Sequence, residues 1–319
     1  MAPEFGRLLH LGNVVVDIVL DVPALPERGG DVLATGSDTT TGGGFNVMVA
    51  AARQGLPVVY AGAHGTGPFG DRARAAMLGA GIEVRQRPKA GLDTGFVVSI
   101  VDAEGERTFV TSTGAEATLT GEDLDAIRPG PRDVVYLSGY GMLHPINRRA
   151  LMDWLPGVRD DITVVFDPGP LVHLIPADVT RSVMSRADWW SCNAREATRT
   201  TGRDDPAAAA AELARLTGRR GVLVRTGPDG CLVAAHDAAP VHVPGFDVHA
   251  VDTNGAGDTH TGVFVAAIAT GADAIDAART ANAAAALSVT SYGPATAPTA
   301  ADLARFVADQ PAGIFGGRV

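Results

Sequence analysis

The stretch VDTNGAGDTHTGVFVAAIATG, which runs from Val251 to Gly271, joins a glycine-rich turn to an apolar helix. Gly255, Ala256 and Gly257 carry almost no side chain, so the backbone there can approach a ligand closely. Free N–H groups at a helix start, together with the partial positive charge of the helix dipole, attract anions. We therefore expect an anion-binding site where this helix begins.

Outward from this stretch, short apolar and β-branched runs alternate with alanine-rich segments of helical composition. The runs begin near Leu8, Val58, Asp133, Asp161, Ala187 and Gly221. Helical segments such as 46–54 and 206–216 lie between them. The alternation predicts βαβ units around a mostly parallel sheet, with ligands gathering at the carboxyl ends of the strands.

The segment from Gly95 to Ala115 breaks this rhythm. It contains two alternating runs joined by the turn-rich sequence AEGE, which predicts a β-hairpin. With the extended DVLATGSDTT of residues 31–40, it is expected to form a small sheet that covers the active site. We expect one domain, residues 1–319, with a discontinuous β-lid from about 14–40 and 93–115. The lid could pair with a second copy, so a homodimer is expected.

Composition excludes several classes of function. The chain is 46% hydrophobic and 19% charged, which is typical of a globular enzyme. A net charge of −10, with scattered basic residues, opposes nucleic-acid binding. No apolar run approaches about 18 residues, and the first residues lack a basic region followed by a cleavage site. We expect no membrane partner and a cytoplasmic location.

Lys89 is the only lysine, so a phosphate loop that depends on lysine cannot exist. Any phosphate site must use backbone amides, arginine or metal. Cys192 and Cys231 lack the spacing of metal ligands and the density of a disulfide scaffold, and we expect both to be buried and free. We expect His260 to lie on the first turn of its helix rather than to transfer a proton.

Asp258 stands at the predicted helix start, where its carboxylate would lie beside the bound anion. Kinases use such a carboxylate to accept the proton of the attacking hydroxyl. An isolated Asp at this position could instead be an N-terminal cap. Because a cap does not explain the preceding GAG or the additional Asp252, we favour a catalytic role.

Two signatures in the expected order resemble one family. DTNGAGD, from Asp252 to Asp258, looks like the C-terminal signature of the PfkB-type, or ribokinase-like, carbohydrate kinases. TGGGFNVMVAAARQG, from Thr41 to Gly55, looks like the N-terminal signature. Further similarity extends along nearly the whole chain, in GNVVVD from residue 12, GPFGDRARAAMLGAGI from 67, FDPGP from 166, NARE from 193 and RTGPDG from 225.

The resemblance implies an α/β fold with three layers, α/β/α, a mostly parallel central sheet and a small β-sheet lid. It also implies an enzyme that transfers a phosphoryl group from ATP, with Mg²⁺, to an alcohol group of a small molecule. Asp258 carries over as the catalytic base, and the backbone from Asn254 through Gly255 and Ala256 to Gly257 as the anion hole. Donors of this kind contribute about 3 kcal/mol each, which suits a chain with almost no lysine.

Matching positions assign the remaining contacts by resemblance. The substrate contacts would be Asp17, Gly43, Gly44 and Asn46. The nucleotide contacts would be Asn193, Glu196, Thr226, Gly227, Gly230 and Asn254, with Glu196 meeting Mg²⁺ through water. Some family members are activated by K⁺ held by backbone carbonyls, and the matching positions are Asp252, Asn254, Ser288, Ser291 and Gly293.

Several of these residues also have purely structural explanations. Asn193 and Glu196 are three residues apart, so they could form a capping box at a helix start as well as share a ligand. Asp17 could be a surface residue at the end of a strand. The sequence TGPDG, from Thr226 to Gly230, is also an ordinary turn.

The motifs leave the substrate open. Ribokinases have a GGKGAN loop, whereas this chain has TGGGFN, so the resemblance does not extend to ribose specificity. Arg107 could bind a substrate phosphate, although an arginine after a Gly-Glu turn is more often solvated. Phe45, Phe96 and Tyr140 could form a platform for a base, or pack in the core. We rank a neutral sugar or related polyol first and a nucleoside second. A catalytically silent sugar-binding protein is the alternative from another class.

Overall fold

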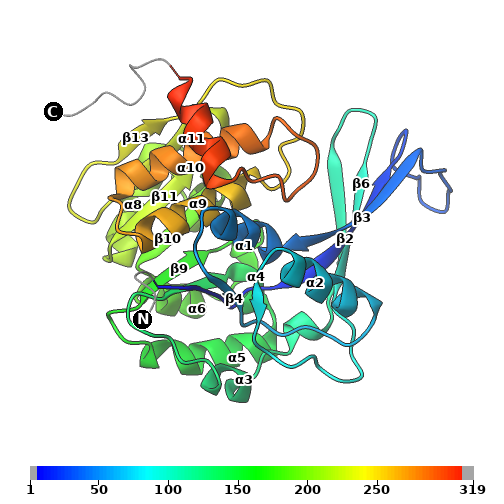
Figure 1. Ribbon diagram of the computed structural model, residues 1–319, viewed down its shortest axis with the longest axis horizontal. Helices are drawn as coiled ribbons and strands as arrows, with labels where there is room; N and C mark the ends of the chain where they lie inside the picture. The colour runs from blue at the N-terminus through cyan, green and yellow to red at the C-terminus, as the bar shows by residue number, and fades with distance from the viewer. Residues whose placement is uncertain (1–5, 311–319) are drawn as a thin grey trace.

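The computed structural model describes residues 6–310, so the first five and last nine residues of the expected 1–319 domain lie outside it. Its largest element is a nine-stranded sheet with the order β13-β12-β11-β10-β9-β8-β1-β4-β5 (Figure 1). Pairing is parallel from β5 to β11, and β12 and β13 add an antiparallel edge. The strands are β1 (Leu8–His10), β4 (Val58–Tyr60), β5 (Glu83–Val84), β8 (Val134–Ser138), β9 (Thr163–Asp167), β10 (Trp189–Asn193), β11 (Gly221–Arg225), β12 (Gly230–Ala234) and β13 (Val241–Pro244).

Helices cover both faces of this sheet. Successive residues of a strand point to opposite faces, so these apolar strands present hydrophobic side chains on both sides. In β8, Val134 and Tyr136 belong to one hydrophobic core, and Val135 and Leu137 to the other. The first core is packed by α1 (Gly44–Arg53), α2 (Pro68–Gly79), α9 (Ala256–Ala269), α10 (Ala274–Ser288) and α11 (Ala300–Ala308). The second is packed by α3 (Gly121–Asp125), α4 (Gly139–Leu143), α5 (Pro145–Trp154), α6 (Ala177–Met184), α7 (Ala194–Thr201) and α8 (Pro206–Thr217). The predicted three-layer α/β/α architecture is confirmed.

Helices α1 and α9 approach each other closely, and this contact positions the candidate site. A Cβ at Gly262 of α9 would lie 2.3 Å from the carbonyl oxygen of Val47 in α1, so a larger residue would force the helices apart. The two helix starts meet, because Asn46 in the first turn of α1 hydrogen-bonds to Asp258 in the first turn of α9. Within residues 6–310, no helix combines the length and apolarity needed to span a membrane.

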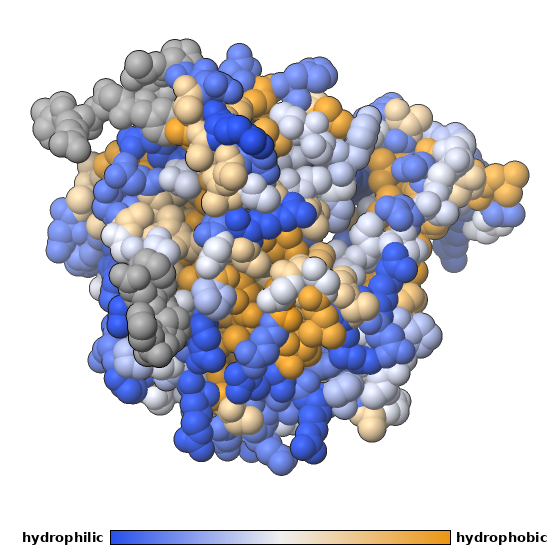
Figure 2. Space-filling view, viewed as in Figure 1, coloured by the Kyte–Doolittle hydropathy of each residue, from blue (hydrophilic) through white to orange (hydrophobic). Residues whose placement is uncertain are grey.

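Four further strands form a small sheet with the order β3-β2-β6-β7, which projects from the body (Figure 1). They are β2 (Val14–Asp21), β3 (Gly36–Gly43), β6 (Phe96–Val101) and β7 (Arg107–Ser112). The β6–β7 pair is the predicted hairpin, whereas only the second half of the DVLATGSDTT segment is strand. The projecting sheet exposes apolar side chains among polar ones (Figure 2), including Phe109 and Val110.

The register of the small sheet places Asp17 in the middle of β2. It lies opposite Thr40 of β3 and Val97 of β6, and the strand continues to Asp21. The interpretation of Asp17 as a surface residue at a strand end is therefore wrong, because the flanking strands half-bury it.

Candidate active site

The start of α9 has the backbone geometry of an anion-binding site. Gly255 precedes the helix in the left-handed conformation, with φ of 75°. A Cβ at Gly255 would lie 2.2 Å from the carbonyl oxygen of Pro294, so a side chain there would displace backbone. No side chain caps the helix, and the N–H groups of Gly257 and Asp258 have no partner in the described part of the chain. These free donors, at the positive end of the helix dipole, can bind an anion.

Asp258 lies in the first turn of α9 and is not its N-cap, which excludes the capping interpretation. Its Oδ2 accepts a hydrogen bond from Nδ2 of Asn46 at 2.9 Å. Burial raises the pKa of Asp258 to about 6, although the bond from Asn46 acts in the opposite direction. A carboxylate with this pKa is ionised at neutral pH and is a stronger base than an exposed aspartate.

The small sheet and α1 bring predicted substrate residues to the same place. Asp17 is close enough for its charge to raise the pKa of Asp258, and burial raises the pKa of Asp17 itself to about 6. Gly42 leaves room for the Asp17 carboxylate, since a Cβ there would lie 1.9 Å from Oδ2. Gly43 turns the chain into α1 with φ of 63°. Gly44 packs against His10, so a Cβ there would lie 2.0 Å from the imidazole.

The buried polar atoms beside these residues include two that have no hydrogen-bond partner within residues 6–310. They are Oδ1 of Asn46 and Oγ1 of Thr40, which lies opposite Asp17 in the small sheet. A buried acceptor or hydroxyl without a hydrogen bond costs free energy unless a ligand or water satisfies it. Together with the Asp17 carboxylate, these atoms suit a ligand with several hydroxyl groups.

A cavity of about 700 Å³ adjoins the other side of the α9 start. Its size suits a small-molecule ligand as large as a nucleotide. Among the six predicted nucleotide contacts, Asn193, Gly227 and Gly230 line it, whereas Glu196, Thr226 and Asn254 do not. An apolar part of the wall, suited to a planar base, is formed by Phe246, Val248, Ala250, Ala285, Ala286 and Val289.

Asn193 and Glu196 form the capping box that their spacing predicts. The Asn193 side chain accepts from the N–H of Glu196 at 2.9 Å, and Oε2 of Glu196 accepts from the N–H of Asn193 at 2.8 Å. Burial raises the pKa of Glu196, and the neighbouring Asp167 raises it further, while Arg225 acts in the opposite direction. The structural role is therefore present, and a role in metal binding stays a prediction.

Arg225, at the end of β11, is a residue of this site that sequence reasoning missed. Its guanidinium lies beside Asp167 and Glu196 and also lines the cavity. A signal was available, because Arg225 directly precedes the TGPDG turn in a chain whose phosphate site cannot use lysine. His260 lines the same cavity and hydrogen-bonds to Asn282 at 2.9 Å.

Hydrogen bonds connect several of the positions expected to hold K⁺. The Asp252 carboxylate accepts from the N–H of Gly293 at 3.2 Å and from the N–H of Asn254 at 2.9 Å. Ser288, the last residue of α10, is buried, whereas Ser291 is exposed. Because carbonyl oxygens would bind the ion, these contacts leave the K⁺ site a prediction.

Arg107 of β7 links the small sheet to the loop before α9. Its Nη2 lies 2.8 Å from Oδ1 of Asp252, and its charge also lowers the pKa of Asp17, against the larger effect of burial. The interpretation of Arg107 as a simply solvated side chain is therefore wrong. An arginine already paired with a carboxylate is also less available for a substrate phosphate.

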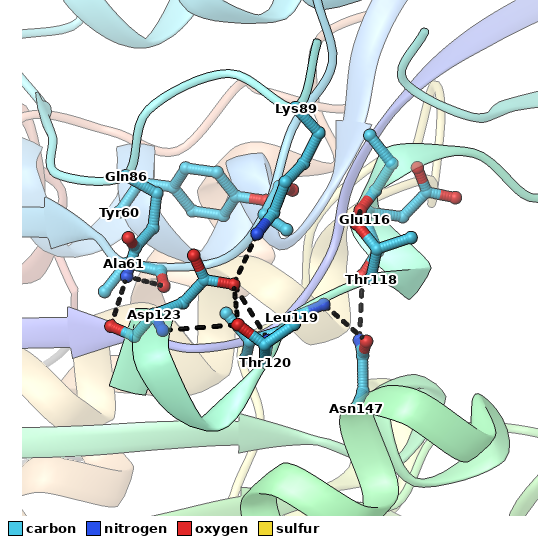
Figure 3. Close-up of polar contacts among 12 residues, drawn as sticks. Tyr60, Ala61, Gln86, Lys89, Glu116, Thr118, Leu119, Thr120, Asp123 and Asn147 are labelled. Carbon is cyan, nitrogen blue, oxygen red and sulfur yellow. Dashed lines mark hydrogen bonds and ion pairs between the residues drawn. The ribbon is translucent and has the colours of Figure 1, made fainter. Parts of the chain in front are cut away.

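The single lysine takes no part in this site. Nζ of Lys89 lies 2.6 Å from Oδ2 of Asp123, within a polar network that includes Gln86 and Thr120 (Figure 3). Asp123 also completes the capping box at the start of α3. The positive groups near the predicted phosphate site are thus backbone amides and arginine.

Burial of Asp258 predicts a pH-dependent cost to stability. Its folded-state pKa, about 6, is above the ordinary value of 3.8, so the stabilising contribution of the protonated form is present below pH 4 and is lost as pH rises through 6. Asp258→Asn should therefore raise the free energy of unfolding at pH 8 by up to about 3 kcal/mol, and change it little at pH 4. Urea titrations at both pH values test this, with the exposed Asp153→Asn as the control. An equal effect at both pH values would contradict it.

Comparison with known proteins identifies the family. The model of the pfkB family carbohydrate kinases matches residues 7–301. The uncharacterized sugar kinase YegV of Escherichia coli (strain K12) is 30% identical over 300 residues, which cover 93% of this chain and 92% of that protein. The ATP-dependent ribose-1-phosphate kinase of Halopiger xanaduensis is 32% identical over 312 residues, covering 95% and 99%. The structure of Arabidopsis thaliana ribokinase complexed with ribose and ATP has the same fold, with a TM-score of 0.78 and 24% identity over 95% of this chain and 99% of that one. The chain therefore belongs to the pfkB family of carbohydrate kinases.

Proposed function

We propose that this protein transfers the γ-phosphoryl group of ATP to a hydroxyl of a small neutral sugar or related polyol. The observation that carries the proposal is the position of Asp258. This buried carboxylate lies in the first turn of α9, next to the N–H groups that have no partner within residues 6–310. It accepts a hydrogen bond from Asn46 and is close enough to Asp17 for the charge of Asp17 to raise its pKa. An anion site on one side and hydroxyl-binding groups on the other are what in-line phosphoryl transfer needs.

The residues of the candidate site could accept the hydroxyl proton and stabilise the negative charge of the transferring phosphoryl group. As the sugar oxygen bonds to the γ-phosphorus, its proton passes to Asp258, and ADP leaves with the electron pair of the broken P–O bond. The N–H groups of Gly257 and Asp258 would stabilise the negative charge on the transferring group. The small sheet that carries Asp17 could exclude water when a sugar binds, which would suppress ATP hydrolysis.

Mg²⁺ supplies charge neutralisation to such a reaction and would arrive with the phosphates of ATP. Within residues 6–310, no group of three or more His, Cys, Asp or Glu side chains could hold a metal ion by itself. The carboxylates of Asp167 and Glu196 lie beside the cavity-lining Arg225, and oxygen ligands of this kind fit Mg²⁺ held largely by phosphates and water. A K⁺ site at Asp252, a homodimer and a cytoplasmic location stay predictions.

A nucleoside acceptor is the second candidate, and the aromatic residues favour it less. Phe45 packs in the core, and Phe96 packs against Phe69 with ring centroids 5.3 Å apart. Tyr140 is close enough to Asp258 for that carboxylate, after burial, to raise the pKa of Tyr140. A catalytically silent sugar-binding protein would have no need for a buried carboxylate in the first turn of α9, which supports the kinase proposal.

ADP release from Mg-ATP, measured across neutral sugars, sugar phosphates and nucleosides, tests the proposal. We expect turnover with a neutral sugar or polyol, and little with the other two classes. The sugar phosphates belong in the panel because of the similarity to a ribose-1-phosphate kinase. Preferred turnover of a nucleoside or a sugar phosphate would replace the acceptor class. Binding of sugar or ATP without turnover of any acceptor would favour the silent sugar-binding protein.

A further inference from the structure

One end of the Arg225 guanidinium is fixed by hydroxyl groups in the centre of the fold. Nη1 donates to Oγ of Ser191 at 2.6 Å and to Oγ1 of Thr261 at 2.9 Å. The two hydroxyls also bond to each other at 3.1 Å. Because Ser191 lies on β10 and Thr261 on α9, this part of the side chain is held between the main sheet and the helix that forms the anion site.

The other terminal nitrogen lies between two carboxylates. Nη2 is 3.2 Å from Oδ2 of Asp167 and 3.9 Å from Oε2 of Glu196. Burial acts to lower the pKa of Arg225, but the surrounding groups, Asp167 and Glu196 foremost among them, together raise it. Arg225 is therefore a permanent cation, and its partners keep it charged in a buried place.

The remaining nitrogen faces the start of α9. Nε makes no hydrogen bond in the part of the chain that the structure describes, whereas both terminal nitrogens do. A Cβ built on Gly257 would lie 3.5 Å from Nε, which places this N–H beside the backbone donors of the anion site. Arg225, Gly257 and Asn193 line the same cavity.

We propose that Arg225 binds the polyphosphate of the donor nucleotide through Nε–H, and that Asp167 and Glu196 balance its charge until the nucleotide arrives. This inference rests on the proposed use of a nucleoside triphosphate. Backbone amides offer partial charges, and Arg225 adds a full one at the same place. Arg225 is thus a substrate-binding residue that supplies the positive charge which lysine supplies in other phosphate sites. Ser191 and Thr261 hold its side chain in position.

ADP carries phosphates and adenosine does not, so their binding in the absence of metal can distinguish a phosphate contact of Arg225 from a purely structural role of this residue. Calorimetry in EDTA would compare the wild type with Arg225→Met, Arg225→Lys and Arg199→Met. Arg199 is a matched control, because it is an exposed arginine on α7 that donates to a carbonyl. We expect Arg225→Met to weaken ADP binding about tenfold to a hundredfold, as for a lost charge-assisted hydrogen bond, and to leave adenosine binding within about twofold. Arg225→Lys should retain part of the ADP affinity, and Arg199→Met all of it.

A double variant keeps the test decisive if Arg225→Met folds poorly. Removing the cation leaves Asp167 and Glu196 unpaired, so Arg225→Met with Asp167→Asn restores the local charge balance. We expect the double variant to recover stability in urea without recovering ADP affinity. Equal weakening of ADP and adenosine, or ADP affinity restored in the double variant, would overturn the inference alone. A wild type that binds neither ligand would overturn the proposed function, and this inference with it.

Discussion

Asp258→Asn is expected to lower kcat by about a thousandfold, because positioned general bases typically contribute about 10²-fold to 10⁴-fold. The amide has nearly the same shape as the carboxylate and can still accept the hydrogen bond from Asn46. The site should therefore keep its geometry and lose only the base. Single-turnover measurement of product formation, with ATP and the sugar found in the acceptor panel, gives the rate of the chemical step directly.

Asp17→Asn is the matched comparison for this variant. Burial raises the pKa of both carboxylates to about 6, so the two substitutions remove similar charges from similar surroundings. If Asp17 binds sugar hydroxyls, its loss should raise KM for the sugar more than it lowers kcat. A wild-type kcat at saturating sugar that rises with pH through about 6, together with a flat kcat profile for Asp258→Asn, would support Asp258 as the base. An Asp258→Asn enzyme within tenfold of the wild-type kcat would exclude it.

Local sequence patterns predicted the elements that carry the site. The βαβ rhythm gave the parallel sheet, because buried parallel strands are short apolar runs between helices. The break in that rhythm at residues 95–115 gave the β6–β7 hairpin of the small sheet. The left-handed Gly255 and the uncapped helix start lie within one local motif, so the candidate anion site was accessible to reasoning from adjacent residues.

Local sequence patterns could not predict the contacts between segments that are distant in the sequence. Asn46 and Asp258 are 212 residues apart, and Arg107 and Asp252 are 145 apart, so only the packing of α1 on α9 and the path of the small sheet decide that they meet. Arg225 was missed for the same reason. Its contact with Asp167 joins residues that are 58 apart, and an arginine at the end of an apolar strand does not reveal which carboxylate will face it.

Gly255→Ala should have the second large effect, on the anion site itself. At φ of 75° an alanine is strained, and its Cβ would lie 2.2 Å from the carbonyl oxygen of Pro294, so the turn must move. Movement of the turn carries the N–H groups of Gly257 and Asp258 away from the transferring phosphoryl group. Because the loss of one such donor typically costs about a hundredfold or more in kcat, we expect at least that decrease. Steady-state kinetics and urea unfolding of the same preparation would measure activity and stability together.

Gly271→Ala separates the steric effect from the backbone effect. Gly271 follows the same helix, α9, with φ of 92°, but a Cβ there would meet no atom within 4 Å. Both alanines therefore carry the strain of a left-handed residue, about 1 kcal/mol, and only the one at Gly255 collides with backbone. We expect Gly271→Ala to lose stability of that order with unchanged kcat, and Gly255→Ala to lose more stability and most of its activity. Equal losses of stability with full activity in both would mean that the loop from Asn254 to Gly257 tolerates displacement, and that its amides do not form the anion hole.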